Sequence, residues 1–231
     1  MNGKRVRHLN KAAFKEGPIA YWMSRDQRTQ DNWALLYAQK LSIKEKQPLI
    51  VIFAMAPNFL EATLRQYDFM IKGLQVVEQE LASYNIPFTV LIGDPIETIE
   101  SFVKENSIGA LVTDFDPLKL KRSWKDSLFK TLDISFDEVD AHNIIPCWET
   151  SAKQEYAAYT IRPKIHKKLH DYLEPFPYLK ENIENNLRFS NVKWAELCKK
   201  LDIDKDVKPV EWINPGEKEA YKELEYFISK K

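Results

Sequence analysis

Residues 21–35, YWMSRDQRTQDNWAL, contain the transition that decides the fold of this chain. An apolar segment ends at Met23, charged and polar residues follow, and a helical pattern begins near Trp33. In α/β proteins the turn after the first strand commonly receives a phosphate, and glycine allows the backbone to approach it closely. This turn contains no glycine, so we expect its charged side chains to meet a different ligand or partner.

Apolar runs recur on both sides of this turn, and helical patterns separate them. Their nearly continuous apolar character is typical of parallel strands that are covered on both faces. Helical patterns over 29–43, 60–84, 95–106 and 117–132 predict right-handed crossovers between the strands. We therefore predict an α/β fold, a Rossmann-like doubly wound parallel sheet of five strands in the order 3-2-1-4-5, with helices on both faces and a helical linker after it. The predicted strands are 18–23, 48–55, 86–93, 109–115 and 134–140.

The pattern changes after Asp140, where prolines and helical patches replace the strand repeat. We predict a basic amino-terminal arm over 1–17, an α/β domain over 18–178 and a polar linker over 179–211. A new helix is expected after Pro215-Gly216, within 212–231, and it resembles the opening of a further domain.

The composition argues against several functional classes. Lysine and arginine total 34 and aspartate and glutamate total 34, so no overall positive field would attract nucleic acid. No apolar run approaches the roughly 20 residues of a membrane span. The amino terminus lacks the apolar core of a signal peptide, which predicts a cytoplasmic location. Cys147 and Cys198 are distant from each other, which favours free thiols over a disulfide framework or a zinc site.

Familiar catalytic and cofactor motifs are missing. The chain has six glycines, and none of them form the cluster of a dinucleotide fingerprint or a P-loop. His166 and His170 lie four residues apart but lack a third ligand, so we expect no metal site. Cys147 has no histidine pattern that marks a nucleophile. No residue is predicted to be catalytic.

The charged turn remains the strongest candidate site. In the predicted strand order, the ligand crevice lies between the loops after strands one and four, at 23–32 and 113–117. Arginines and carboxylates there could hold a polar aromatic ligand against an apolar wall. The alternative is a salt-bridge cluster that stiffens the turn or docks another domain. The candidate cofactor-binding residues are Trp22, Met23, Arg25, Asp26, Arg28, Asp31, Asn32, Asp114 and Phe115.

Four blocks of sequence, in order, resemble the amino-terminal half of class II cyclobutane pyrimidine dimer DNA photolyases. The resemblance runs from Pro18 to Leu173 and resumes in WINPGEKEAYKELEYF. The four blocks are YWMSRDQRTQDNWALLYAQ, FLEATLRQYDFMIKGL, GALVTDFDPL and EVDAHNIIPCWETSAKQEYAAYTIRPKI.

The resemblance implies that residues 18–178 are an antenna domain, which binds a deazaflavin or folate chromophore. In this family a second, helical domain holds FAD and the flipped-out dimer, and light-excited reduced flavin splits the dimer by electron transfer. The resemblance places residues 212–231 at the first helix of that domain, truncated here. We therefore expect this chain alone to bind no FAD and to repair no DNA. The implied partners are the helical FAD-binding domain and, through the complete enzyme only, damaged DNA.

Two alternatives stay open at this point. The chain could be a free-standing small-molecule or protein-interaction module that uses the same sheet without repair. An adenine-nucleotide enzyme of this fold is a weaker alternative, because the HxGH pattern and the serine-glycine-glycine phosphate loop are absent. If the chain docks a helical domain, we expect an uncovered apolar patch over Ile144 to Ile165.

Overall fold

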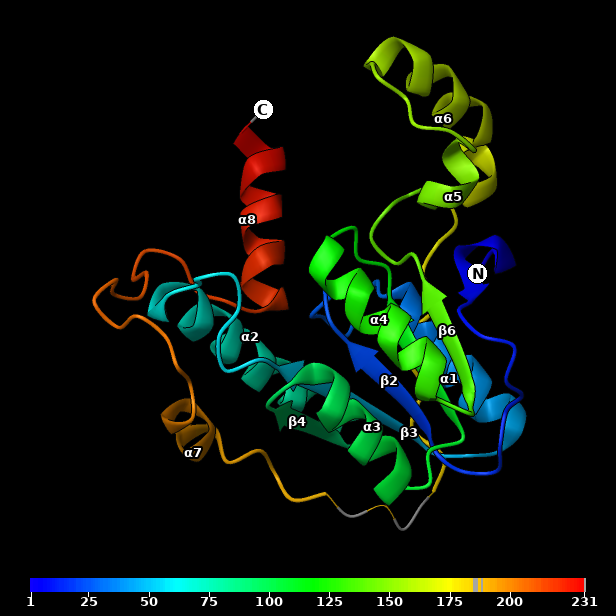
Figure 1. Cartoon of the computed structure of the whole chain (residues 1–231). Helices are drawn as coiled ribbons and strands as arrows, with labels where there is room; N and C mark the ends of the chain where they lie inside the picture. The colour runs from blue at the N-terminus through cyan, green and yellow to red at the C-terminus, as the bar shows by residue number, and fades with distance from the viewer. Residues whose placement is uncertain (185–186, 188, 231) are drawn as a thin grey trace.

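A computed structural model of the chain, which describes residues 1–184, 187 and 189–230, has a mixed six-stranded sheet with helices on both faces (Figure 1). The strand order is β1-β6-β5-β2-β3-β4. All neighbouring pairs from β6 to β4 are parallel, and β1 pairs with β6 in the antiparallel direction. The strands are β1 (Val6–His8), β2 (Ile19–Met23), β3 (Leu49–Met55), β4 (Phe88–Ile92), β5 (Ala110–Asp114) and β6 (Ser135–Val139).

The central strand β2 is buried on both faces, as its uninterrupted apolar sequence requires. Ile19, Tyr21 and Met23 pack into one apolar cluster with α1 (Trp33–Glu45) and α2 (Leu64–Ala82). Ala20 and Trp22 point the other way, into a second cluster with α3 (Pro95–Glu105) and α4 (Lys119–Thr131). This alternation follows from the two-residue period of a strand, and it makes β2 the layer that joins the two halves of the core.

The amino-terminal segment corrects our prediction of a five-stranded, wholly parallel sheet with a basic arm before it. A short 3-10 helix, Gly3–Arg5, leads into β1, whose residues Val6 and His8 pair with Val139 and Asp137. Arg7 forms a salt bridge of 2.5 Å with Glu138, which is buried. Three residues, one apolar and two basic, are too short a pattern to identify a strand, and this segment becomes one because β6 offers it an edge.

Side-chain caps set the starts of several helices. Asn32 Oδ1 accepts the backbone N–H groups of Ala34 at 3.0 Å and Leu35 at 3.1 Å, which starts α1. Asp94 does the same for α3, with Pro95 in the first turn. The helices of the α/β body are α1 (Trp33–Glu45), α2 (Leu64–Ala82), α3 (Pro95–Glu105) and α4 (Lys119–Thr131).

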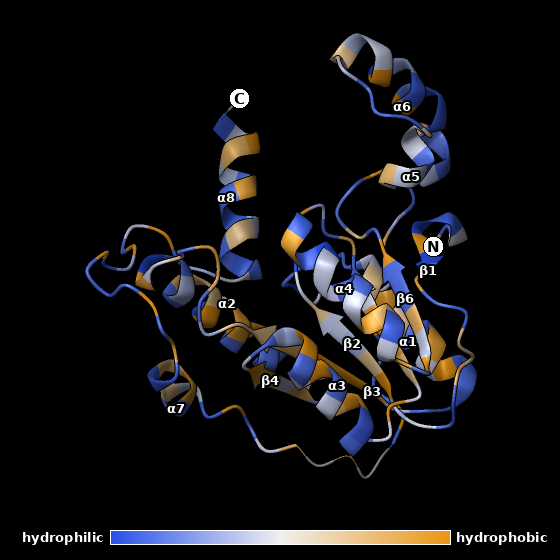
Figure 2. Cartoon of the chain, viewed as in Figure 1, coloured by the Kyte–Doolittle hydropathy of each residue, from blue (hydrophilic) through white to orange (hydrophobic). Residues whose placement is uncertain are grey.

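After β6 the chain forms helices that extend beyond the sheet. The helices α5 (Cys147–Thr150) and α6 (Ala158–Tyr172) project from the same side of the body as α8 (Glu217–Lys230), and a space separates them (Figure 1). Figure 2 shows apolar residues distributed along α8, which contains no buried residue. The body therefore presents two projecting helical elements next to the carboxyl ends of its strands.

Described residues of the stretch between α6 and α8, which includes the linker predicted over 179–211, lie against the body. The stretch contains α7 (Trp194–Lys199), and Leu197 and Leu201 are buried against the core. Trp194 Nε1 donates to Glu78 Oε2 at 2.7 Å. These contacts hold the stretch against α2 and β4.

Candidate functional site

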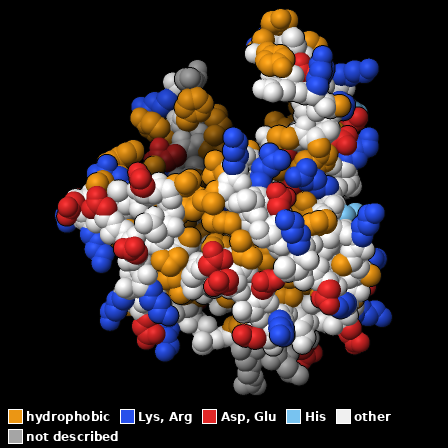
Figure 3. Space-filling model, viewed as in Figure 1, with side chains coloured by type: hydrophobic (Ala, Val, Ile, Leu, Met, Phe, Trp, Pro, Cys, Tyr) orange, Lys and Arg blue, Asp and Glu red, His pale blue; other side chains and the backbone are white. Residues whose placement is uncertain are grey.

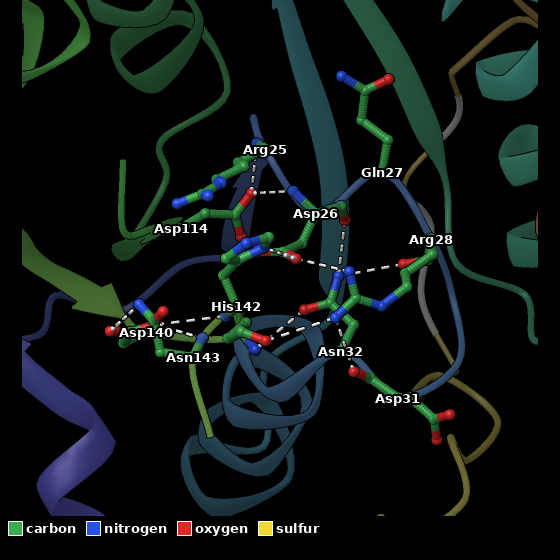
Figure 4. A network of polar contacts seen from close by, with 12 residues as sticks. Arg25, Asp26, Gln27, Arg28, Asp31, Asn32, Asp114, Asp140, His142 and Asn143 are labelled. Carbon is green, nitrogen blue, oxygen red and sulfur yellow. Dashed lines mark hydrogen bonds and ion pairs between the residues drawn. The ribbon is translucent and has the colours of Figure 1, made fainter. Parts of the chain in front are cut away.

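The charged turn after β2 encloses a carboxylate of the chain itself. Asp114, the last residue of β5, is fully buried and accepts three backbone N–H groups of the turn through Oδ2. The donors are Ser24 at 2.8 Å, Arg25 at 2.8 Å and Asp26 at 3.1 Å (Figure 4). The backbone amides that would receive a phosphate in a glycine-rich turn are therefore occupied by Asp114.

A second set of hydrogen bonds connects this carboxylate to the start of α1. Tyr21 donates its hydroxyl to Asp114 Oδ1, and Asn32 Nδ2 donates to Tyr21 Oη at 3.1 Å. Burial, and then the nearby Asp26 carboxylate, raises the pKa of Asp114 above its ordinary value, while the donated hydrogen bonds oppose that rise. Asn32 also donates to the carbonyl oxygens of Asp26 and Arg28, each at 3.0 Å. The turn is thus held in one conformation by buried polar contacts.

Arg28 and Asp26 form the charged pair of the turn. Arg28 Nη1 lies 2.5 Å from Asp26 Oδ1, and Nη2 donates to the carbonyl oxygens of Asp31 and Ala141 at 3.0 and 3.4 Å. His142 Nδ1 lies 3.6 Å from the same Asp26 oxygen. The other oxygen, Asp26 Oδ2, is buried and has no hydrogen-bond partner within the described residues.

The predicted site residues come together only in part. The turn meets Asp114 as the predicted crevice requires, but Met23 is buried in the core and Phe115 packs edge-on against Trp148 with ring centroids 5.7 Å apart. Asp31 is exposed and accepts the Tyr221 hydroxyl at 2.5 Å. Most charges of the turn are therefore engaged by the protein, which fits the salt-bridge alternative, and the role of these residues in cofactor binding stays a prediction.

An apolar cavity of about 210 Å³ lies beside the turn, at the carboxyl ends of β2 and β3. Trp22 is the one predicted site residue among its lining residues. Figure 3 shows hydrophobic side chains gathered on the surface between α2 and α4, where these residues lie. Aromatic walls with few polar groups are typical of sites for planar ligands. The apolar lining residues include Trp22, Phe53, Met55, Phe59, Tyr67, Met70 and Trp124.

Sequence reasoning missed most of this cavity, because its walls come from four separate segments. Phe59 belongs to the loop before α2, Trp124 belongs to α4, and their ring centroids lie 5.9 Å apart. The sequence around Phe59 and the sequence around Trp124 give no sign that the two residues line the same cavity. The one available signal was general: ligands of doubly wound sheets bind beyond the carboxyl ends of the strands.

A second cavity, of about 840 Å³, lies between the turn, α2 and α8. Arg25, Arg28 and Asp31 line it, and Gln27 and Met70 line both cavities. The Gln27 side chain points away from the polar network of the turn (Figure 4), although its Nε2 donates to the Ser24 carbonyl at 3.1 Å. The two cavities are therefore neighbours that share part of a wall.

The first turn of α8 is attached to the charged turn. Glu217 accepts the backbone N–H and the hydroxyl of Thr29 at 3.1 and 2.9 Å, and the backbone N–H of Gln30 at 3.0 Å. Burial raises the pKa of Glu217, and these donors oppose the rise. The attachment holds α8 over the second cavity.

Among the described residues, no group of three or more histidine, cysteine, aspartate or glutamate side chains is arranged to hold a metal ion. Within the same part of the chain, no helix combines the length and the apolar character needed to cross a membrane. Both cysteines are free thiols.

Comparison with known proteins gives the affiliation of this fold and site. The family model for DNA photolyase matches residues 19–181. A protein of Potorous tridactylus named deoxyribodipyrimidine photo-lyase is 43% identical over 236 residues, which cover 100% of this chain and 44% of the relative. A protein of the same name from Arabidopsis thaliana is 42% identical, over 92% of this chain and 45% of the relative. The chain therefore spans less than half the length of these curated relatives.

A solved structure supports the same fold. The crystal structure of a bacterial class III photolyase from Agrobacterium tumefaciens matches 95% of this chain and 46% of its own chain, with a TM-score of 0.69 and 17% sequence identity. At that identity the likeness concerns the fold alone. The family model covers more than half of the chain, and it agrees with the named relatives. This chain belongs to the DNA photolyase family.

Proposed function

We propose that this chain is the antenna-binding α/β part of a class II deoxyribodipyrimidine photo-lyase. The observation that carries the proposal is the aromatic cavity at the carboxyl ends of β2 and β3, in a chain that belongs to the DNA photolyase family. In the proposed role, a chromophore bound here absorbs light and passes the excitation energy to FAD, which drives the repair of cyclobutane pyrimidine dimers. The affiliation with class II rests on the four sequence blocks that resemble that class.

The cavity suits a planar heteroaromatic chromophore such as a deazaflavin or a folate. Trp22 is almost completely buried and provides a rigid apolar wall, and Phe59 and Trp124 also line the cavity, with ring centroids 5.9 Å apart. Ser24, Gln27 and Lys121 supply polar groups on the side of the charged turn. The protein residues would hold and orient such a ring and exclude water from its faces.

A direct titration tests this proposal. Purified protein is titrated with a deazaflavin and with a reduced folate, and binding is followed by chromophore fluorescence. We expect saturable binding of at least one of them, which Trp124→Ala weakens by removing part of the wall. Phe129→Ala serves as the control, because Phe129 is an exposed aromatic residue of the same helix outside the cavity. Equal binding by both variants, or none by the wild type, would contradict the assignment of the cavity.

The proposal assigns FAD and the DNA lesion to a helical domain that lies outside the elements described above. We therefore expect the purified chain to carry no stoichiometric flavin and to leave dimers in irradiated DNA unchanged under light. Stoichiometric bound flavin, or light-dependent loss of dimers, would overturn this part of the proposal.

The same proposal makes the helical FAD-binding domain the partner of this chain. The face between α8 and the α5–α6 segment is the proposed docking surface. Tyr156 and Tyr159 are 89% and 79% exposed, and α8 exposes Leu224, Phe227 and Ile228 on the other side. Exposed apolar side chains in such numbers are typical of a surface that another protein covers.

A further inference from the structure

The attachment of α8 to the charged turn brings two carboxyl groups to one hydroxyl group. Thr29 Oγ1 lies 2.7 Å from Glu80 Oε2 of α2 and 2.9 Å from Glu217 Oε2 of α8. Both separations are those of hydrogen bonds between oxygen atoms. The first turn of α8 is therefore joined to α2 through a single side chain of the turn.

A hydroxyl group has one proton, so the Thr29 hydroxyl can donate to only one of the two carboxyl groups. If both groups were ionised, the second contact would bring two oxygen atoms together without a proton between them. Both contacts are satisfied when one carboxyl group is protonated, because it then donates to Thr29 Oγ1 while the hydroxyl donates to the other. The geometry therefore fits one proton shared by Glu80 and Glu217.

The surroundings of Glu217 favour the protonated form of its carboxyl group. The side chain is half-buried, and burial raises the pKa of Glu217 above its ordinary value. Hydrogen bonds from Thr29 and from the backbone N–H of Gln30 oppose this rise, and the nearby Glu80 carboxylate adds to it. Among the described residues, no lysine, arginine or histidine side chain forms a salt bridge with Glu217. The shared proton therefore belongs on Glu217.

The cations around Glu217 face other carboxylates. Lys218 Nζ lies 4.0 Å from Glu80 Oε1, and its side chain is 79% exposed, so it balances the charge of Glu80 only weakly. In the charged turn, Arg28 is paired with Asp26. The titratable and charged groups that surround Glu217 are Glu80 of α2, Arg25, Arg28 and Asp31 of the turn, Lys218, Glu219, Tyr221, Lys222 and Glu223 of α8, and His142 next to Asp26.

We propose that this proton is a latch, which holds α8 against the charged turn and over the second cavity while it is bound. When the Glu217 carboxyl group ionises, its O–H bond breaks, the proton passes to solvent and the electron pair stays on Oε2. Two carboxylates then compete for one hydroxyl group and repel each other, so α8 loosens. The latch depends only on groups of the chain itself, and it is independent of the ligand that the neighbouring aromatic cavity receives.

The direction of the pH dependence follows from the raised pKa of Glu217. The attached form of α8 binds this proton more tightly than the detached form, in which the group has its ordinary value. The attachment is therefore strongest below the ordinary glutamate pKa of 4.5, and it weakens as pH rises through the raised value. The loss should be confined to α8, because the core strand β2 does not contact Glu217.

Hydrogen exchange between pH 5 and pH 8 tests the latch on the whole chain. The measured quantity is the protection factor of the α8 amides, corrected for the intrinsic pH dependence of exchange, with the β2 amides as the internal reference. We expect protection in α8 to fall by about threefold to tenfold over this range, and protection in β2 to stay constant. In Glu217→Gln the amide keeps a donor for Thr29, so protection should not change with pH. Glu80→Gln removes the competing carboxylate and should reduce the change.

Glu225→Gln is the matched control, because Glu225 is an exposed glutamate of the same helix outside the second cavity. It should follow the wild type at every pH, and thermal melts should show that all variants are folded. The latch is wrong if the α8 amides of the wild type are unprotected at pH 5 or equally protected at pH 8. It is also wrong if Glu217→Gln retains the pH dependence, which would then come from another group such as His142. A parallel loss of protection in β2 would show a global effect and would equally contradict it.

Discussion

The carboxylate oxygen Oδ2 of Asp114 lies 2.8 Å from the backbone nitrogen of Arg25. This contact explains why the turn after the central strand contains no glycine. A phosphate group at such a turn needs room and bare backbone, whereas a carboxylate from the neighbouring strand reaches the amides between ordinary side chains. The backbone amides of the turn are therefore occupied by Asp114, and the proposed ligand cavity lies beside the turn.

Replacing Asp114 by asparagine should destabilise the protein by about 2–4 kcal/mol, because an amide NH₂ group would face backbone donors in a buried network. Chemical denaturation measures the loss. Asp126→Asn, at an exposed position of α4, is the control and should change stability by less than about 0.5 kcal/mol. A similar small effect for Asp114→Asn would show that the turn does not depend on this carboxylate.

The same residue predicts a pH dependence. Because the pKa of Asp114 is raised in the folded state, the folded protein binds this proton more tightly than the unfolded chain. The contribution of Asp114 to stability is therefore largest below the ordinary aspartate pKa, and it decreases as pH rises through the raised value. The difference in unfolding free energy between the wild type and Asp114→Asn, measured from pH 3 upwards, should decrease with pH. An increase would contradict the assigned direction.

The two arginines of the turn should behave differently when changed to alanine. Arg28 bonds Asp26 and two carbonyl oxygens, so Arg28→Ala should lower the melting temperature by removing the guanidinium that pairs with the buried Asp26 carboxylate. Within the described residues, the Arg25 guanidinium makes no hydrogen bond or salt bridge, so Arg25→Ala should leave the melting temperature unchanged. Thermal melts separate the two. Any effect of Arg25→Ala would then appear in chromophore binding or in docking of the helical domain.

Arg5 should be essential for holding the segment after β6. It is buried between the rings of Trp33 and Tyr172, at 5.2 and 5.3 Å from their centroids, and donates to the carbonyl oxygens of Asn143 and Ile144 at 2.9 and 2.6 Å. Arg5→Met should cost about 2–4 kcal/mol, because it leaves these carbonyl groups without their donor. Arg5→Lys should recover only part of the loss, since lysine lacks the planar fork.

Hydrogen exchange of residues 140–172 and chemical denaturation measure this effect. Lys11→Met is the control, because Lys11 is an exposed lysine of the same amino-terminal segment. If residues 140–172 are equally protected from exchange in Arg5→Met and Lys11→Met, Arg5 does not hold them in place.

Tyr221→Phe should loosen α8 from the charged turn. The hydroxyl of Tyr221 donates to Asp31 at 2.5 Å, and this bond raises the pKa of Tyr221 to about 12. The hydroxyl contributes its stabilisation below the ordinary tyrosine pKa of 10.0 and loses it as pH rises towards about 12. Limited proteolysis should cleave α8 faster in Tyr221→Phe than in the control Tyr226→Phe, whose side chain is 60% exposed. Equal rates would show that the hydroxyl does not anchor the helix.

The sequence alone was sufficient to predict the strands β2 to β6 and the helices between them, because these elements depend on local patterns. Unbroken apolar runs such as 49–55 require burial on both faces, and Asn32 and Asp94 start helices with their own side chains. The family was likewise visible in consecutive residues. These features need only neighbours along the chain.

The tertiary structure alone decided which partners the polar and aromatic residues meet. Val6–His8 becomes a strand only because β6 offers it an edge, and the amides of residues 24–26 are closed by a carboxylate about 90 residues away. The cavity likewise combines Trp22, Phe59 and Trp124 from separate elements. These contacts depend on how strands and helices pack in three dimensions. A sequence pattern does not give the distance in space between segments that are far apart in the chain.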